Sequence, residues 1–244
     1  MKKRKVKRKL KYKNIFKLLI VILIVLIAFL DLLYVFNKVN EYEKEEKTKE
    51  EIHKTKEETL NYIEKLHKEN KHVIGWIKID NTNIDYPVLY SKDDYYLNHN
   101  YKKEEDKNGS IYIDKYNNLT DKNLIFHGHN MRDGSMFHDL LEYKDKDFFK
   151  KHKTVKFYTL DGYKEYEIIS AFTSKVYKKT DNVFKYYKYY GDKINNNYDE
   201  YIKNIKNLSL YKTNTKVTNE NLITLSTCEY STKNGRMVVV AKEK

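Results

Sequence analysis

Residues 221–241 read Asn-Leu-Ile-Thr-Leu-Ser-Thr-Cys228, then Glu-Tyr-Ser-Thr-Lys-Asn, then Gly-Arg236-Met-Val-Val-Val-Ala. The short apolar runs at 222–225 and 237–241 predict two strands that flank a polar loop. Cys228, the only cysteine of the chain, ends the first strand, and Arg236 opens the second. In an antiparallel hairpin these positions lie at the same end of the sheet, so a guanidinium can reach a thiolate or the carbonyl that it attacks. A buried, inert cysteine beside a solvent-facing arginine is the alternative.

The chain from His72 onward repeats this pattern of short apolar runs and turns. Six further strands are predicted at 74–79, 84–89, 109–113, 124–127, 155–160 and 163–172. Eight short strands in about 170 residues favour a mainly β domain, a closed barrel or a sandwich, over βαβ units. Helical inserts are predicted at 136–143, 146–152 and 198–208.

The N-terminus combines a basic tail with a long apolar run. Residues 1–17 hold ten Lys or Arg and no acid, and residues 18–36 are apolar apart from Asp31. Nineteen helical residues span about 28 Å, close to the thickness of a hydrocarbon core. A cleavable secretory signal is the alternative, but no small-residue cleavage pattern follows the run. We therefore expect a single-pass cell-membrane anchor whose basic tail is cytoplasmic and whose remaining chain is extracellular.

The net charge of +13 is concentrated in that tail. Beyond residue 36 there are 38 basic and 34 acidic residues, which leaves only +4. A balance this small does not predict a nucleic-acid-binding surface. We expect no nucleic acid among the partners.

Residues 37–70 are dominated by Glu, Lys and Thr. Glu43 with Lys47 and Glu50 with Lys54 have the spacing of helical ion pairs, so this segment is predicted to be a helical stalk. Its few apolar residues gather toward the C-terminal end, where the last turns are expected to pack on the following domain, 71–244. A coiled-coil dimer is the alternative, but the heptads are sparse.

Two histidines follow the predicted strand at 124–127. His127 and His129 are separated by one residue, so both rings lie on one face of an extended chain. No third ligand stands at a persuasive spacing, and we expect no metal and no cofactor. A cysteine and a histidine far apart in sequence are instead typical of nucleophilic cysteine enzymes, whose partners meet only in the fold.

Three motifs together resemble those of the sortase family. They are Thr-Leu-Ser-Thr-Cys228 with Arg236 eight residues later, Gly-His129-Asn-Met-Arg-Asp-Gly-Ser-Met-Phe, and Val-Ile-Gly-Trp-Ile-Lys-Ile at 73–79 with Ile-Asp-Tyr-Pro-Val at 84–88. The Gly-His-Asn-Met segment resembles class B. The resemblance covers about residues 71–244, and residues 176–217 fall where class B members carry a helix-containing substrate loop.

The resemblance implies an eight-stranded sortase barrel and a cysteine transpeptidase. Such an enzyme cleaves the C-terminal sorting signal of a secreted protein and joins the new carboxyl end, through a thioester, to an amine of peptidoglycan or its lipid-linked precursor. It implies that Cys228 is the nucleophile, that His129 acts as acid and base, and that Arg236 stabilises the negative charge that develops on the carbonyl oxygen. His127 is expected to have only a packing role. Ser226 lies on the same face of its strand as Cys228 and is a candidate to hydrogen-bond substrate, although a core hydroxyl is the alternative. An extracellular cysteine peptidase that only hydrolyses, or an anchored receptor without catalysis, would use the same barrel.

Overall fold

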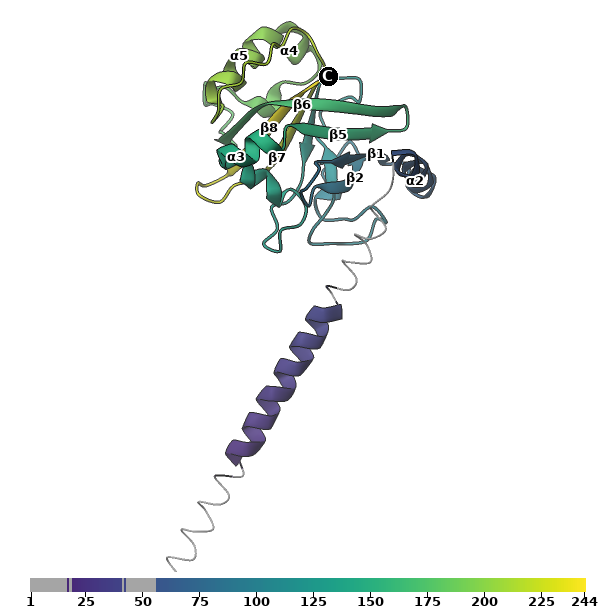
Figure 1. Ribbon diagram of the computed structural model, residues 1–244, viewed down its shortest axis with the longest axis vertical. Helices are drawn as coiled ribbons and strands as arrows, with labels where there is room; N and C mark the ends of the chain where they lie inside the picture. The colour runs from purple at the N-terminus through teal and green to yellow at the C-terminus, as the bar shows by residue number, and fades with distance from the viewer. Residues whose placement is uncertain (1–16, 18, 41, 43–55) are drawn as a thin grey trace, which may run out of the picture. The chain divides into compact units, whose positions relative to one another are not determined.

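The computed structural model describes Lys17, residues 19–40, Tyr42 and residues 56–244 (Figure 1). The chain divides into two compact units, Met1–Lys54 and Thr55–Lys244. The first unit contains the helix Leu19–Asn40, whose most apolar stretch has a mean hydropathy of 3.1. Its 22 residues give about 33 Å of helix, so length and composition suit either a membrane span or a signal sequence. Of the predicted stalk, 37–70, residue 41 and residues 43–55 lie outside the described residues.

The second unit is a closed barrel of eight strands, which confirms the predicted fold class. The strands are β1 Val73–Lys78, β2 Asp85–Tyr90, β3 Ile111–Ile113, β4 Asn123–His127, β5 Thr154–Thr159, β6 Gly162–Lys175, β7 Leu222–Cys228 and β8 Gly235–Glu243. Around the barrel they run β1-β2-β3-β4-β7-β8-β6-β5. Two neighbouring pairs, β2 with β3 and β4 with β7, are parallel, and the others are antiparallel.

Strand β7 shows how alternation in the sequence divides the core into two layers. Ile223 and Leu225 belong to the main hydrophobic core, whereas Leu222 belongs to a second cluster on the other face. The second cluster also contains residues of α5 (Tyr198–Leu208), which buries Tyr198, Tyr201, Ile202 and Ile205. These four residues follow the spacing of one helical face, so α5 covers the outer side of the barrel beside β6, as Figure 1 shows.

The remaining helices lie outside the barrel and agree with the predictions in part. Helix α2 (Lys56–Glu69) contacts β1 and buries Ile63 and Leu66, which confirms that the apolar end of the segment before the barrel packs on it. Helix α3 (Lys146–Lys151) lies within the predicted helix 146–152. The short elements η1 (Tyr95–Leu97), η3 (Tyr186–Lys188) and α4 (Gly191–Asn196) have no counterpart among the predictions.

The helical insert predicted at 136–143 is present, but it is a 3-10 helix that begins two residues later than predicted. The structure has the 3-10 helix η2, His138–Lys144. Met136 has φ of 59° and forms an isolated bridge with Asn130, so its backbone cannot begin a right-handed helix. The apolar spacing that favoured a helix arises because Phe137, Leu140 and Tyr143 all enter the main core.

Candidate active site

The hairpin β7–β8 places Cys228 directly opposite Arg236, as predicted. Cys228 is the last residue of β7, and its side chain is half-buried. Arg236 is also half-buried, and its Nη1 donates to the carbonyl oxygen of Gly235 at 2.9 Å. Both residues therefore lie at one end of the barrel, and both are partly open to solvent.

The parallel pairing of β4 with β7 brings His129 to the same end. The register runs from Asn123 opposite Leu222 to His127 opposite Ser226. His129 follows two residues after the last pair, at the end of the strand pair where Cys228 lies, and its neighbour Asn130 donates to the Cys228 carbonyl oxygen. Beyond the last strand pair, the Gly128 N–H donates to the Ser226 carbonyl oxygen at 3.3 Å, so the two chains stay together up to the site.

The imidazole of His129 is held by η1. Its Nε2 lies 2.8 Å from the carbonyl oxygen of Leu97. A carbonyl oxygen only accepts, so Nε2 carries the proton in this contact, and Nδ1 is the unprotonated nitrogen of the neutral ring. This contact with a backbone carbonyl therefore fixes the tautomer of the neutral ring.

Asn130 connects the histidine loop to the cysteine. Its Nδ2 donates to the carbonyl oxygen of Cys228 at 2.9 Å, and its Oδ1 accepts from Nδ1 of His138 at 2.7 Å. The side chain is buried, with 8% of the residue exposed. Asn130 thus holds the backbone of the nucleophile candidate directly. Its place after His129 was part of the motif, but no local pattern indicated this contact or the role of His138.

A buried carboxylate secures the loop that follows Cys228. Glu229 accepts hydrogen bonds from Nζ of Lys144 at 2.8 Å and from the hydroxyl of Ser231 at 2.5 Å. These hydrogen bonds, that of Lys144 foremost, hold the pKa of Glu229 below its ordinary value. The loop closes on Gly235, where an added Cβ would stand 2.3 Å from the carbonyl oxygen of Glu229. Only glycine fits this close approach, one residue before Arg236.

His127 is paired elsewhere, with Asp114. Its Nε2 lies 2.9 Å from Oδ2 of Asp114, and its ring contacts that of Tyr112 at 5.5 Å between centroids. Burial opposes the ionised carboxylate, but the hydrogen bond and charge of His127 hold the pKa of Asp114 below its ordinary value. This arrangement favours the packing role predicted for His127. Within the described part of the chain, no three His, Cys, Asp or Glu side chains are grouped to hold a metal ion.

Comparison with known proteins identifies the family. The family model "Sortase domain" matches residues 77–244, which is more than half of the chain. The chain belongs to the sortase family. The sortase B of Listeria monocytogenes is 41% identical over 191 residues, 76% of this chain and 75% of the relative, and that of Staphylococcus aureus is 35% identical over 189 residues, 74% and 73% of the two chains.

Solved structures of sortase B agree with this family assignment. The sortase B of Clostridium perfringens has a TM-score of 0.64 at 34% identity and covers 74% of this chain and 98% of its own. A sortase B–substrate complex from Staphylococcus aureus has a TM-score of 0.65 at 31% identity, covering 85% and 94%. The protein is therefore a sortase of class B, and its family is one of cysteine transpeptidases.

In this sortase the predicted substrate residue Ser226 is covered. It is 1% exposed, and its hydroxyl lies 2.8 Å from that of Tyr186 in the segment between β6 and β7. Burial raises the pKa of Tyr186, so its phenol stays neutral. Contact between Ser226 and a substrate would require Tyr186 to move, and the role predicted for Ser226 stays a prediction.

Proposed function

We propose that this sortase cleaves the C-terminal sorting signal of secreted proteins and joins the new carboxyl end to a peptidoglycan amine. The observation that supports the proposal is the position of Cys228 opposite Arg236 at the end of the barrel that the chain carrying His129 also reaches. They are assigned as nucleophile, oxyanion stabiliser and general acid–base. The acceptor amine belongs to peptidoglycan or to its lipid-linked precursor.

In the first half-reaction the Cys228 thiolate attacks the scissile carbonyl carbon, and a C–S bond forms. The oxygen of the tetrahedral intermediate becomes negative, and Arg236 and backbone N–H groups near Cys228 stabilise it. Loss of one such donor typically costs about 2.7 to 4 kcal/mol in barrier height. As the C–N bond breaks, protonated His129 gives its proton to the leaving amine, and a thioester remains.

In the second half-reaction the acceptor amine attacks the thioester. Neutral His129 takes the proton of the amine as the new C–N bond forms, and the C–S bond breaks to return the Cys228 thiolate. The proton donated in the first half-reaction is thereby recovered. Water at the same position would give the free acid, which is the outcome expected of a peptidase.

The proposal also assigns the parts of the chain. Residues 1–17 form a cytoplasmic tail, 18–36 the anchor of the cell membrane, 37–70 the stalk, and 71–244 an extracellular catalytic barrel. The ten basic residues before the apolar helix support this orientation because such residues stay cytoplasmic. External protease acting on wall-free cells should remove the barrel and spare the tail. Protection of the whole chain, or a mature protein that begins after Phe36, would contradict this topology.

The decisive experiment measures products by mass. A sorting-type peptide with Pro at its second position and Thr at its fourth is incubated with the enzyme and rising concentrations of an amine that resembles the wall cross-bridge. The amide-to-acid ratio should rise with amine under ping-pong kinetics, and a thioester should be trapped on Cys228. Water is present at about 55 M, so mostly amide at modest amine concentration requires an acceptor site that orients the amine.

Variants give the controls for this experiment. Cys228→Ala should abolish turnover, and His129→Ala should nearly abolish it. His127→Ala is the matched histidine control and should keep substantial activity once its folding is checked. Acid alone at every amine concentration would indicate a peptidase. A Cys228 that resists a mild thiol reagent, with no cleavage, would indicate a receptor.

A further inference from the structure

A second feature of the barrel lies away from Cys228. An open groove of about 450 Å³ is lined by α3, the middle of β6 and the segment 211–215. Its lining includes Lys146, Lys150, Lys153 and Lys212, which we name the lysine groove. On β8, Lys242 faces Glu167 of this groove, and Arg236 lies six residues away, or about 20 Å along the strand. The Glu167 end of the lysine groove is therefore far from Arg236, whereas its Tyr211 end adjoins Lys144, which pairs with Glu229 next to Cys228.

The positive charge of the lysine groove is largely uncompensated. Among the described residues, Lys146, Lys153 and Lys212 have no carboxylate within ion-pair distance. Lys150 contacts only Asp147, at 3.3 Å, and both side chains are more than half exposed. An exposed pair of this kind is weak, so Lys150 is free to turn to another anion.

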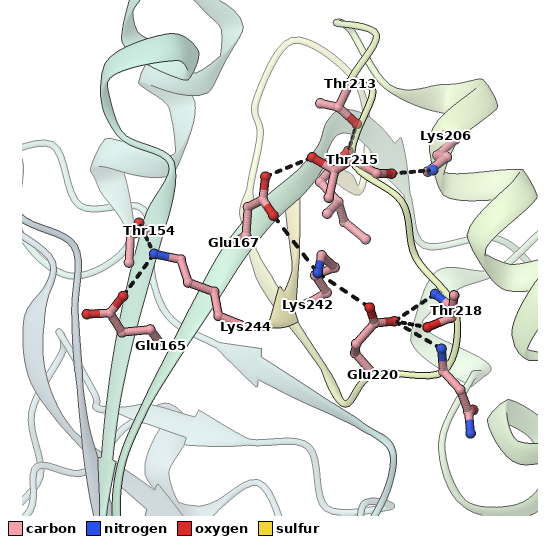
Figure 2. A network of polar contacts seen from close by, with 12 residues as sticks. Thr154, Glu165, Glu167, Lys206, Thr213, Thr215, Thr218, Glu220, Lys242 and Lys244 are labelled. Carbon is pink, nitrogen blue, oxygen red and sulfur yellow. Dashed lines mark hydrogen bonds and ion pairs between the residues drawn. The ribbon is translucent and has the colours of Figure 1, made fainter.

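The carboxylate that lines the groove is already engaged. Figure 2 shows Glu167 between Thr215 and Lys242. The hydroxyl of Thr215 donates to Glu167 at 2.8 Å, and Nζ of Lys242 lies 4.0 Å from it. Lys242 also pairs with Glu220 at 3.4 Å. One carboxylate offsets at most one of the four lysine charges, so the groove keeps a net positive charge.

The walls of the groove are fixed in place. Phe149 is buried and packs against Tyr211, with 5.1 Å between ring centroids. The Tyr211 hydroxyl donates to the carbonyl oxygen of Lys144, and that of Thr213 donates to the carbonyl oxygen of Ile169 at 3.0 Å. The segment that carries Lys212 is thus tied both to the 3-10 helix and to β6. A ligand would therefore contact a preformed surface, in which the rings of Phe149 and Tyr211 lie between the lysine side chains.

We propose that the lysine groove binds a linear, multivalent phosphate chain. Lys146 and Lys150 lie one turn apart on α3, about 6 Å along its axis, and Lys153 continues the row just beyond the helix. This row of positive charges along one wall of the groove suits an anion whose charges also repeat along a chain, and it suits a single small ion less well. Lysine acts as a point charge that suits the several oxygens of phosphate, and the groove has no arginine to form a planar fork with a carboxylate.

The test uses the full chain in nanodiscs of zwitterionic lipid and labelled short-chain inorganic polyphosphate, with binding followed by anisotropy. Replacement of Lys146, Lys150, Lys153 and Lys212 by Gln should weaken binding at least about tenfold. A matched set with the same loss of charge, Lys65, Lys68, Lys107 and Lys203 to Gln, should change it less than about twofold. Peptide cleavage should stay at the level of the unmodified chain in both sets.

Several results would overturn the proposal. One is an unchanged affinity in the groove variant, and another is an equal loss in the matched set, which would mean nonspecific attraction. Equally tight binding of polyglutamate would remove the preference for phosphate. Binding to vesicles of anionic phospholipid but not to polyphosphate would assign the groove to a membrane surface instead. The proposal does not depend on the transpeptidase reaction, because the anisotropy assay measures polyphosphate binding independently of peptide cleavage.

Discussion

Replacement of Asn130 by Ala tests whether the contact between the histidine loop and the nucleophile sets the reaction rate. The amide makes two hydrogen bonds, at 2.9 Å to the Cys228 carbonyl and at 2.7 Å from His138, in a site that is 8% exposed. Each such bond contributes about 1 kcal/mol net, and a partner left unpaired adds to the loss. The free energy of unfolding should fall by about 2–3 kcal/mol, which lowers Tm by about 5–10 °C in a domain of this size.

The effect on catalysis should exceed the effect on folding. Without Asn130, the backbone of Cys228 loses its tie to the loop that carries His129. A displacement of about 1 Å in a catalytic constellation can cost on the order of a hundredfold in rate. We expect kcat to fall between about tenfold and a hundredfold with little change in KM, because Asn130 acts through Cys228 and does not bind the substrate.

The control is a buried amide of similar connectivity at a distance from the site. Asn117 is fully buried, donates from Nδ2 to the Asn123 carbonyl at 2.8 Å and to the Asp121 carboxylate at 2.9 Å, and accepts from the Ile125 N–H at 2.9 Å. Asn117→Ala should lower Tm comparably and leave kcat per folded molecule unchanged. The assay is peptide cleavage well below both unfolding transitions. An unchanged kcat in Asn130→Ala, or an equal loss in Asn117→Ala, would refute the reasoning.

Three further changes probe the supports of the site. Arg236→Lys should lower kcat by on the order of a hundredfold, since an ammonium cannot reproduce the planar fork of guanidinium; near-normal kinetics of peptide cleavage would contradict the assignment. Gly128→Ala would place a Cβ 2.4 Å from Cδ1 of Ile111, so urea unfolding should show a loss of about 1–3 kcal/mol, and unaltered stability would disprove this clash. Glu229→Gln should lower Tm at neutral pH. Because the pKa of Glu229 is lowered in the folded state, the stabilisation by its carboxylate is present above the ordinary carboxyl pKa of about 4.3 and is lost as pH falls through the lower folded value. The difference in Tm between the unmodified protein and the variant should therefore disappear in acid. A difference that does not depend on pH would argue against this role of Glu229.

The local parts of this fold were accessible from sequence because their signals are local. The hairpin β7–β8 joins two apolar strands through a short polar loop, so the pairing of Cys228 with Arg236 followed from adjacency alone. The eight strands were likewise predicted as short apolar runs between turns, and their closure into a barrel is confirmed. For the hairpin and for each strand, the deciding residues lie within about ten positions of one another, whereas closure of the barrel depends on pairings between distant strands such as β4 and β7.

The contacts that complete the site join residues about 100 positions apart. Asn130 binds the backbone of Cys228, and Lys144 pairs with Glu229 across 85 residues. No periodicity in a single sequence specifies which strand lies beside which, so these partners were not predicted. The error at Met136 has a different origin, since its backbone conformation is set by a bridge to Asn130, six positions earlier, and not by the helical spacing of its neighbours.

The register between β4 and β7 decides whether the site exists at all. A slip of one residue would set Gly128 beside Cys228 and turn His129 toward the opposite face of the sheet. Polar contacts pin this register at both ends of the strand pair. At the start, the Thr224 hydroxyl donates to the buried Asn123 side chain at 2.9 Å, and at the end the Thr227 hydroxyl donates to the Gly128 carbonyl at 2.8 Å. Apolar side chains tolerate a shifted neighbour, whereas a buried hydroxyl that loses its acceptor does not, so these two threonines stabilise the alignment that runs up to His127 opposite Ser226.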